Sequence, residues 1–366
     1  MAPRLPLLRP ERVTVSKHIV IVAMLLSYVH LASAGQTKFL EEPEHSVVKM
    51  EKLPAGENIL WRDPGDVSTL DLAYGIGGRD LEPQPPFFFI KEDLSGSNPK
   101  VLVKDGKDRK WSVKWSEEAH SDVFGSRMAW ACGFVAQPEY YVAEGQIRGI
   151  EKGLKRAASV IHGDGYFKSA RFQLRNDDPK FLKTAGWSWV NSPFRGSPHV
   201  QGLKILMMLL SDWDNKDARD QDRDSNLAVF QEQGPNGPRY LYFIADWGGS
   251  MGKWGGVATR SKWDAKGFAT QTADFVKGVH NGLVEWGYTG QRTEDQVRDI
   301  KVSDVQWLLK YLGRVTDDQI RNALQASGAT PEEVGSFTRS LRDRIIQMQR
   351  AAGIAPWNRQ GGVLIY

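Results

Sequence analysis

The sequence has little cysteine and little histidine. Its 366 residues include one cysteine, Cys132, and seven histidines. A single cysteine excludes an intramolecular disulfide and any site built from several thiolates. The histidines form no His-x-His or His-Glu-x-x-His pair, so zinc hydrolase chemistry has no support. Cys132 lies among apolar residues of an expected helix, which favours a place in the core over a nucleophilic role.

The chain also lacks a strong excess of charge. Lys and Arg number 48 against 44 Asp and Glu, a formal charge of +4. Four basic residues (Arg4, Arg9, Arg12, Lys17) minus one acid (Glu11) place +3 of this before residue 35. The remainder is close to neutral, so charge does not argue for nucleic-acid binding. With 41% hydrophobic and 25% charged residues, the composition is that of a globular protein of one or two domains, not of a disordered chain, collagen or a coiled coil.

Only the N-terminus carries a long apolar run. The basic stretch is followed by apolar residues 18–31 and then by Ala32-Ser33-Ala34, a small-x-small cleavage pattern. A transmembrane helix needs about 20 apolar residues, more than this run provides. We therefore expect residues 1–34 to be a signal peptide and the mature chain to be exported, periplasmic or extracellular, with no transmembrane span. An uncleaved anchoring N-terminus is the alternative.

Beyond the leader, strand patterns come first and helical patterns follow. We expect an irregular leading arm at 35–66, a strand-rich portion at 67–142 and a mainly helical portion with one β-hairpin at 143–366. Strands are expected near 87–90, 100–103, 111–115, 140–142, 227–230 and 240–245, and helices at 117–132, 199–211, 303–312, 316–327 and 331–352. Thr316 and Thr330 are the expected N-caps of the last two helices. The order predicts an α+β protein.

The first candidate functional residue is Lys114. It ends an expected strand and precedes an expected helix that carries Glu117, Glu118 and Asp122. A strand lysine held by a helical carboxylate is the arrangement that contacts nucleotide phosphates in kinases. The alternative is an exposed lysine on a strand edge.

The second is Asp214, which directly follows an almost wholly apolar helix. A carboxylate on a loop held by a rigid apolar element suits a base that accepts a hydroxyl proton. The alternative is a helix-terminal cap in a solvated acidic loop.

The third is Asp246, where an apolar strand meets the glycine-rich turn Trp247-Gly-Gly-Ser-Met-Gly252. An Asp at the mouth of a strand can ligate a Mg²⁺ that bridges phosphates. The alternative is an Asp that closes an ordinary turn.

These features, in this chain order, resemble the atypical members of the protein-kinase-like superfamily: HipA-type bacterial kinases, lipid kinases and secretory-pathway kinases. The block from Trp187 to Asp217 also resembles a group of uncharacterised exported bacterial proteins, and the resemblance spans roughly residues 71–350. It implies a two-lobed kinase-like fold, with a small strand-rich N-lobe and a larger helical C-lobe containing a β-hairpin.

The resemblance also implies roles for these residues. Lys114 would contact nucleotide phosphates, with Glu118, or else Asp122, as its partner. Asp214 would be the catalytic base. The cofactor would be ATP with Mg²⁺ or Mn²⁺.

The implied metal ligands are Asp246, as the principal one, and Asn226. Kinases carry the metal-binding Asn five residues after the catalytic Asp, and that position is Arg219 here. Asn226 lies beyond an acidic insertion at 218–225, so its spacing from Asp214 departs from the kinase pattern. Trp247 stands where kinases have the Phe of Asp-Phe-Gly.

The same insertion supports a rival interpretation. Asp220, Asp222, Asp224 and Asn226 place oxygens at alternate positions, as calcium loops do. However, Ser225 occupies the position that needs glycine, which argues against an EF-hand. A looser Ca²⁺ site and a plain solvated charge run stay open.

Two hypotheses follow. The first is an exported kinase-like transferase that moves a phosphoryl or nucleotidyl group from ATP to an unknown protein, glycan or small-molecule acceptor. The second is a catalytically inactive binding protein on the same fold, stabilised by Ca²⁺. The first requires Lys114 and Asp246 to lie within about 10 Å of each other.

Overall fold

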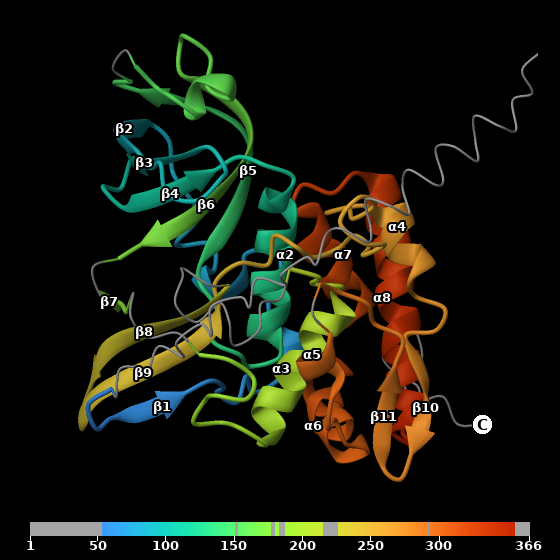
Figure 1. The fold of residues 1–366 in the computed structure, drawn as a ribbon. Helices are drawn as coiled ribbons and strands as arrows, with labels where there is room; N and C mark the ends of the chain where they lie inside the picture. Colours follow the sequence, from blue (N-terminus) through green and yellow to red (C-terminus); the bar gives the residue numbers. More distant parts are fainter. Residues whose placement is uncertain are drawn as a thin grey trace, which may run out of the picture. The chain divides into compact units, whose positions relative to one another are not determined.

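The computed structural model describes residues 53–150, 153–176, 180–182, 187–214, 226–291 and 293–355, called the described residues below. The expected signal peptide, the start of the leading arm and the acidic insertion at 218–225 lie outside them. The described residues form a mixed α+β structure, as predicted (Figure 1). None of their helices has the length and apolar character needed to cross a membrane.

Five strands close into a barrel in the order β2-β3-β4-β6-β5. The strands are β2 (Phe87–Glu92), β3 (Lys100–Lys104), β4 (Lys110–Lys114), β5 (Glu139–Arg148) and β6 (Tyr166–Arg175). Alternating side chains such as Val101, Val103 and Trp111 fill its interior, because successive residues of a strand point to opposite faces. The expected strands at 87–90, 100–103 and 111–115 are thus confirmed.

The barrel extends past the expected boundary at residue 142, which falls inside β5. The sequence pattern missed β6, whose residues Ala170–Leu174 are all buried. One face of β6 lies in the barrel and the other contacts helix α2 (Glu118–Ala131). From Ala170 to Arg175 the sequence alternates apolar and polar residues, so the signal of a strand was present in the sequence and was overlooked.

A second sheet has the order β1-β9-β8-β7. Its strands are β1 (Glu57–Ile59), β7 (Lys180–Phe181), β8 (Leu227–Gly234) and β9 (Gly237–Ile244). The antiparallel β8–β9 hairpin confirms the predicted one. β1 pairs in parallel with β9, so the leading arm is not irregular throughout. Parallel pairing with a strand so distant in the chain leaves no local signal.

The remaining elements are mostly helices. They are α3 (Pro198–Leu209), α4 (Ala265–Thr270), α5 (Glu294–Val297), α6 (Val302–Leu312), α7 (Asp317–Gln325) and α8 (Pro331–Ala351), with 3-10 turns η1 (Val67–Thr69), η2 (Gly75–Gly77) and η3 (Ala157–Ser159). Thr316 and Thr330 form capping boxes at α7 and α8, as expected. The second hairpin, β10 (Val276–His280) and β11 (Leu283–Trp286), was not predicted.

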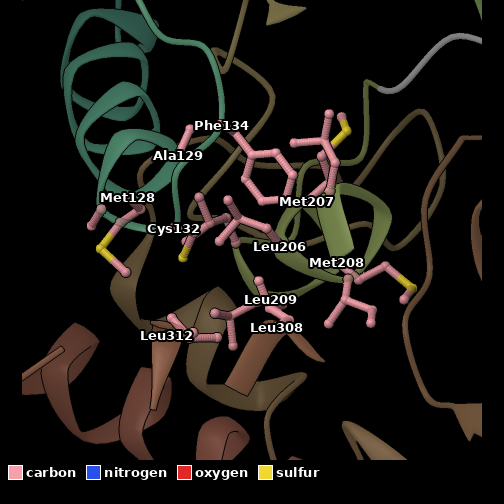
Figure 2. Close-up of a cluster of buried hydrophobic side chains, with 14 of the residues drawn as sticks. Met128, Ala129, Cys132, Phe134, Leu206, Met207, Met208, Leu209, Leu308 and Leu312 are labelled. Carbon is pink, nitrogen blue, oxygen red and sulfur yellow. The ribbon is translucent and has the colours of Figure 1, made fainter. Parts of the chain in front are cut away.

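Buried hydrophobic side chains form two clusters, one inside the barrel and one among the helices and the second sheet. Helix α2 belongs to the second cluster. Its Met128, with the adjoining Cys132, packs in the cluster that contains Leu206 and Leu209 of α3 (Figure 2). Cys132 is fully buried, and burial raises the pKa of its thiol. A core role for Cys132 is therefore supported, as the sequence indicated.

Candidate functional site

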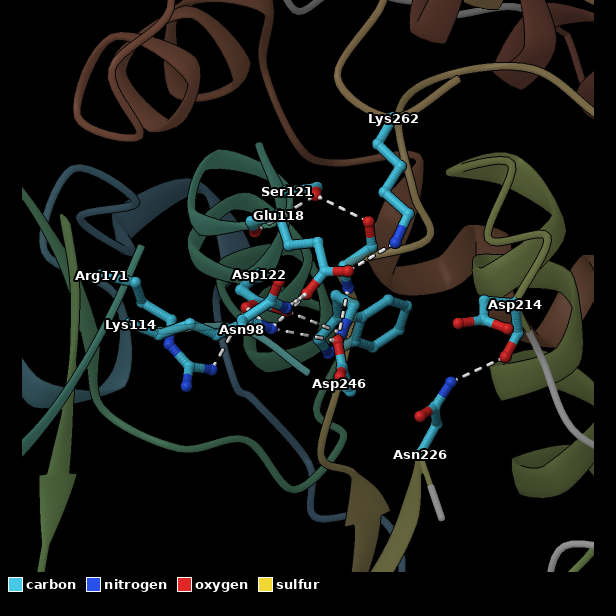
Figure 3. Close-up of polar contacts among 12 residues, drawn as sticks. Asn98, Lys114, Glu118, Ser121, Asp122, Arg171, Asp214, Asn226, Asp246 and Lys262 are labelled. Carbon is cyan, nitrogen blue, oxygen red and sulfur yellow. Dashed lines mark hydrogen bonds and ion pairs between the residues drawn. The ribbon is translucent and has the colours of Figure 1, made fainter. Parts of the chain in front are cut away.

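The site begins where β4 runs into α2. Lys114 ends β4, and Glu118 and Asp122 follow on α2 at a spacing of four residues, which places them on one helix face. The Nζ of Lys114 lies 2.5 Å from Glu118 Oε2, 3.1 Å from Asp122 Oδ2 and 3.8 Å from Asp246 Oδ1 (Figure 3). Four predicted residues therefore meet, and both proposed partners, Glu118 and Asp122, contact the lysine.

A second buried cation, Arg171, was missed by the sequence analysis. It lies opposite Lys114 in the β4–β6 register. Its Nη1 is 3.2 Å from Asp122 Oδ2 and 3.2 Å from Glu139 Oε1. Asp122 is thus shared between a lysine and an arginine. Only the pairing of β4 with β6 brings the two cations together, so no local pattern marked Arg171.

Glu118 has further partners that come from distant loops. Asn98 Nδ2 donates to Glu118 Oε2 over 2.6 Å. Lys262, from the segment after the glycine-rich turn, forms an ion pair with Glu118 Oε1. Glu118 therefore connects β4, the loop before β3 and the segment around residue 262.

The Asp246 turn is tied to α2 by its backbone and by its tryptophan. The N–H of Trp247 donates to Asp122 Oδ1 over 3.0 Å, and the N–H of Gly248 donates to Asp246 Oδ1 over 2.8 Å. The Trp247 ring packs on Gly125 of α2, where a Cβ would come within 2.5 Å of it. Trp247 at this position therefore fills space that a glycine on α2 leaves open.

The two glycines of the turn separate two groups of acidic residues. A Cβ on Gly248 would lie 2.8 Å from Asp246 Oδ1 and 2.7 Å from Glu118 Cγ. A Cβ on Gly249 would lie 2.8 Å from Asp212 Oδ1 and 2.7 Å from the Cβ of Asp214. Real Cβ atoms do not approach so closely. Both positions therefore need glycine, because the turn passes tightly between the Lys114 group and the loop after α3.

That loop carries the predicted catalytic base. Asn226 Nδ2 donates to the backbone carbonyl of Asp214 over 2.6 Å, so two predicted residues are neighbours beside the Lys114 group (Figure 3). Asp212, two residues earlier, was not singled out in the sequence. It is fully buried, and neither of its carboxylate oxygens reaches a hydrogen-bond partner among the described residues. The hydroxyl of Tyr288 donates to the backbone carbonyl of Asp212.

Arg344 of α8 holds the same loop in place. Its Nη1 donates to Leu209 O over 2.8 Å and to Ser211 Oγ over 2.7 Å, and its Nη2 donates to Phe268 O over 3.0 Å. Burial lowers the pKa of this guanidinium to about 9, partly opposed by Tyr288. The end of α3 is therefore fixed to α8 immediately before Asp212. This contact holds the loop that carries Asp214, the candidate base.

The charges of the site shift one another's pKa values. Burial alone would lower the pKa of Lys114, but Asp122 and Asp246 outweigh it and raise that pKa above the ordinary value. Burial alone would raise the pKa of Asp246, yet Lys114 and the Gly248 N–H lower it well below the usual range. Burial raises the pKa of Asp122, although Lys114 and Arg171 act against it. Lys114 and Asp246 therefore stay charged at neutral pH, as do Glu118, whose pKa Lys114 lowers against burial, and Arg171, whose pKa Glu139 and Asp122 raise against burial.

Asp212 is electrostatically different. Burial, and then the nearby charges of Asp214 and Asp246, raise its pKa well above the ordinary value. Asp246 is far more accessible, with 41% of its side chain exposed. Asp246 is thus an accessible carboxylate of the site, whereas Asp212 is buried.

Residues 248–252 also match the Gly-x-Ser-x-Gly pattern of nucleophile elbows. Such an elbow exposes its serine next to a histidine base. Ser250 is instead fully buried, and its hydroxyl has no hydrogen-bond partner among the described residues. The geometry therefore gives no support to acyl-transfer chemistry at this turn.

The fit of a metal ion can be judged from the donor atoms. No group of three or more His, Cys, Asp or Glu side chains within the described ranges is arranged to hold a metal. Mg²⁺ commonly takes only one or two protein ligands, with water and substrate phosphates completing its shell. Asp246, with an accessible carboxylate, fits that role. Asn226 Nδ2 donates a hydrogen bond to the Asp214 carbonyl, which leaves Oδ1 as the amide atom suited to a cation.

Comparison of the chain with models of known protein families finds no match. Comparison with curated proteins finds none either. The case for a function therefore depends on the arrangement of Lys114, Glu118, Asp122, Asp246 and their neighbours.

Proposed function

We propose that this protein is an exported, kinase-like enzyme that binds a metal–nucleotide complex at Lys114 and Asp246 and transfers a phosphoryl or nucleotidyl group. The observation that carries the proposal is the 3.8 Å distance between Lys114 Nζ and Asp246 Oδ1. These residues lie on β4 and after β9, and they meet the requirement of about 10 Å set by the sequence hypothesis.

The fold supports the proposal in a second way. The barrel has its own hydrophobic core, and the helical part has another. Lys114 comes from the barrel, whereas Asp214 and Asp246 come from segments that follow α3 and β9. A site assembled from a small strand-rich part and a larger helical part is the architecture expected of a two-lobed kinase-like fold. A leader with a signal-peptide pattern makes export part of the same proposal.

In the proposed reaction, Lys114 positions the phosphates of ATP by its charge. Asp246 and Asn226 would hold a metal ion, which when bound would neutralise the charge that develops on the phosphates. Asp214 accepts the proton of the acceptor hydroxyl while the hydroxyl oxygen forms a bond to the γ-phosphorus. The bond between that phosphorus and the bridging oxygen breaks, and ADP leaves. Catalysis is then mainly positioning and electrostatic stabilisation.

The proposal is tested by thermal unfolding of the purified protein with Mg²⁺–ATP, Mn²⁺–ATP, each metal alone and ATP alone. A ligand present at about 100 times its Kd adds about 2.7 kcal/mol of stability, an easily measured rise in Tm. We expect a rise that needs both nucleotide and metal and that disappears in Asp246→Asn. Asp274→Asn, which changes an exposed residue that is not part of the proposed site, should keep the rise in Tm. No rise under any of these conditions would refute nucleotide binding.

The second candidate is a catalytically inactive binding protein on the same fold, stabilised by Ca²⁺. It is favoured by the ion pairs that Lys114, Arg171 and Lys262 make with carboxylates, because these pairs offset positive charge that nucleotide phosphates would need. Its calcium site would be the acidic insertion at 218–225, outside the described residues. A Tm that rises with Ca²⁺ alone, and not with nucleotide, would select this candidate. The acceptor, whether protein, glycan or small molecule, is then sought only if nucleotide binds.

A further inference from the structure

A cavity of about 550 Å³ is lined by the end of β6, the segment between α2 and β5, and strands of the second sheet. Its lining residues are separate from those given a role in the proposed function. The pairing of β4 with β6 sets Arg171 opposite Lys114, and it sets Arg175, which lines the cavity, opposite Lys110. Four residues of a strand span about 13 Å. The cavity therefore lies at the other end of β6 from the contacts of Lys114.

The walls of the cavity are largely apolar. The rings of Phe181 and Phe230 meet edge to face, with 5.7 Å between their centroids. The lining also contains an exposed isoleucine, Ile76, and the Phe181 ring is itself 38% exposed. Further apolar lining residues are Trp130, Phe134, Val135, Leu174 and Leu241. Small-molecule pockets have volumes of about 300–1,000 Å³ and mostly apolar walls. The size and the aromatic walls therefore suit a small ligand with a planar apolar body.

The segment between α2 and β5 is fixed on both of its sides. The Oγ of Ser126 donates to the backbone carbonyl of Gln137 over 2.7 Å, and Gln173 Nε2 donates to Gln137 Oε1 over 2.7 Å. On the other side, the N–H of Arg62 donates to the backbone carbonyl of Gly133 over 2.8 Å. These bonds hold the wall of the cavity without a ligand, so a ligand pays little to order it.

Four charged residues line the cavity, and one of them has no partner of opposite charge. Arg62 forms an ion pair with Glu232 over 3.0 Å. The Oδ1 of Asp63 accepts a hydrogen bond from a backbone N–H two residues later. Arg175 makes no ion pair and no side-chain hydrogen bond with any described residue. Its positive charge is therefore available to an anion.

A second donor lies next to Arg175. Glu139 pairs with Gln173 across β5 and β6, and the antiparallel register continues to set Gln137 beside Arg175. The Oε1 of Gln137 is occupied by Gln173, and its Nε2 donates to no described residue. A guanidinium and an amide N–H₂ side by side match the two oxygens of a carboxylate.

We propose that this cavity binds a small aromatic carboxylate. The carboxylate accepts hydrogen bonds from Arg175 and Gln137, and the ring lies against Phe181 and Phe230. One unpaired cation matches the single charge of a carboxylate better than the double charge of a phosphate group.

The test is calorimetric titration of the full chain with 2-naphthoate, and separately with the uncharged 2-naphthylmethanol, at constant ionic strength without metal or nucleotide. We expect saturable binding of 2-naphthoate that is at least about tenfold tighter than that of the alcohol, because only the carboxylate makes charge-assisted hydrogen bonds.

Two variants test the two halves of the cavity. Arg175→Met should weaken 2-naphthoate about tenfold and leave the alcohol unchanged, whereas Phe181→Ala should weaken both ligands. Arg148→Met and Phe88→Ala are the matched controls, since they change an exposed arginine and an exposed phenylalanine outside the cavity. Both controls should keep the affinity of the unmodified protein for 2-naphthoate. All four positions are exposed, so the variants should fold, and an unchanged Tm without ligand checks this.

Absence of saturable 2-naphthoate binding would overturn the proposal. Equal affinities for the acid and the alcohol would overturn the carboxylate. Binding that is insensitive to Arg175→Met or to Phe181→Ala would place the ligand elsewhere and overturn the site. Displacement of 2-naphthoate by Mg²⁺–ATP, or loss of its binding in Asp246→Asn, would assign it to the nucleotide site and overturn the proposal too.

Discussion

Lys114 and Asp212 are buried ionisable residues on opposite sides of the same glycine-rich turn, and their surroundings differ sharply. Lys114 is 5% exposed and has three carboxylates within 4 Å. Asp212 is fully buried, and no described residue donates a hydrogen bond of normal geometry to its carboxylate. Neighbouring carboxylates therefore balance the charge of Lys114. The Asp212 carboxylate has no such partner among the described side chains.

The difference indicates how the surroundings of Lys114 and those of Asp212 should respond to mutation and to pH. A buried ion network with several partners holds its geometry without a ligand, although it contributes little net stability. A buried carboxylate without a partner is tolerated when it holds a proton. The surroundings of Lys114 should thus be sensitive to the loss of a side chain, whereas those of Asp212 should be sensitive to pH.

The largest effect is expected from Lys114→Met. The change keeps the length of the side chain but leaves Glu118, Asp122 and Asp246 facing one another with less compensating charge. Removing one partner of a buried pair costs about 3–5 kcal/mol. Urea unfolding at pH 7 measures this as a lower midpoint.

The control for this change is Lys100→Met, one strand away in register with Lys114. Lys100 pairs with Asp93, of which 36% is exposed, over 3.6 Å. Its loss should cost less than about 1 kcal/mol. Equal midpoints for the two variants would show that the buried network does not differ from a partly exposed pair.

A smaller effect is expected from Gly249→Ala. The added methyl group would meet Asp212 and the backbone N of Asp214, 2.9 Å away, and these atoms cannot move without shifting the loop. Such overpacking costs about 1–3 kcal/mol. Gly163→Ala is the matched control, since a Cβ there meets no atom within 4 Å. A Gly249→Ala protein as stable as the control would contradict the tight passage of the turn.

The smallest effect, and one of opposite sign, is expected from Asp212→Asn. The raised pKa of Asp212 in the folded protein means that its contribution to stability is complete below its unfolded pKa and is lost as pH rises through the folded pKa. The amide cannot ionise, so the variant should match the wild type near pH 4 and be more stable by about 1 kcal/mol at pH 8.

The measurement for Asp212→Asn is the urea midpoint at intervals from pH 4 to pH 8. The wild type should lose stability toward high pH more steeply than the variant. A variant that is less stable than the wild type at pH 8 would mean that the Asp212 carboxylate is ionised and paired in the folded protein.

Local patterns identified several elements correctly. The strands at 100–103 and 111–115, the helix at 117–132 and the caps Thr316 and Thr330 are confirmed. They depend on alternation, helical periodicity and capping, which are properties of neighbouring residues. β1 gave no local signal, because its partner β9 is far away in the chain. β6 was overlooked although its sequence alternates apolar and polar residues from Ala170 to Arg175.

The residues of the candidate site also divide into those that the sequence predicted and those that it did not. Lys114, Glu118 and Asp246 were chosen from their places at the ends of elements, and the structure brings them together. Arg171 and Lys262 could not be chosen, because each is an ordinary basic residue in its own segment. Their importance comes from a strand register and from a returning loop.

The sequence by itself determined the α+β class, the main elements and the order in which Lys114, Asp214 and Asp246 occur. Tertiary structure alone decided which carboxylates share Lys114, that Arg171 lies beside it and that Asp212 is buried without a partner. The physical reason is the distance along the chain over which each effect acts. Periodicity and capping act over a few residues, whereas the charge and burial of a side chain depend on every segment that packs against it.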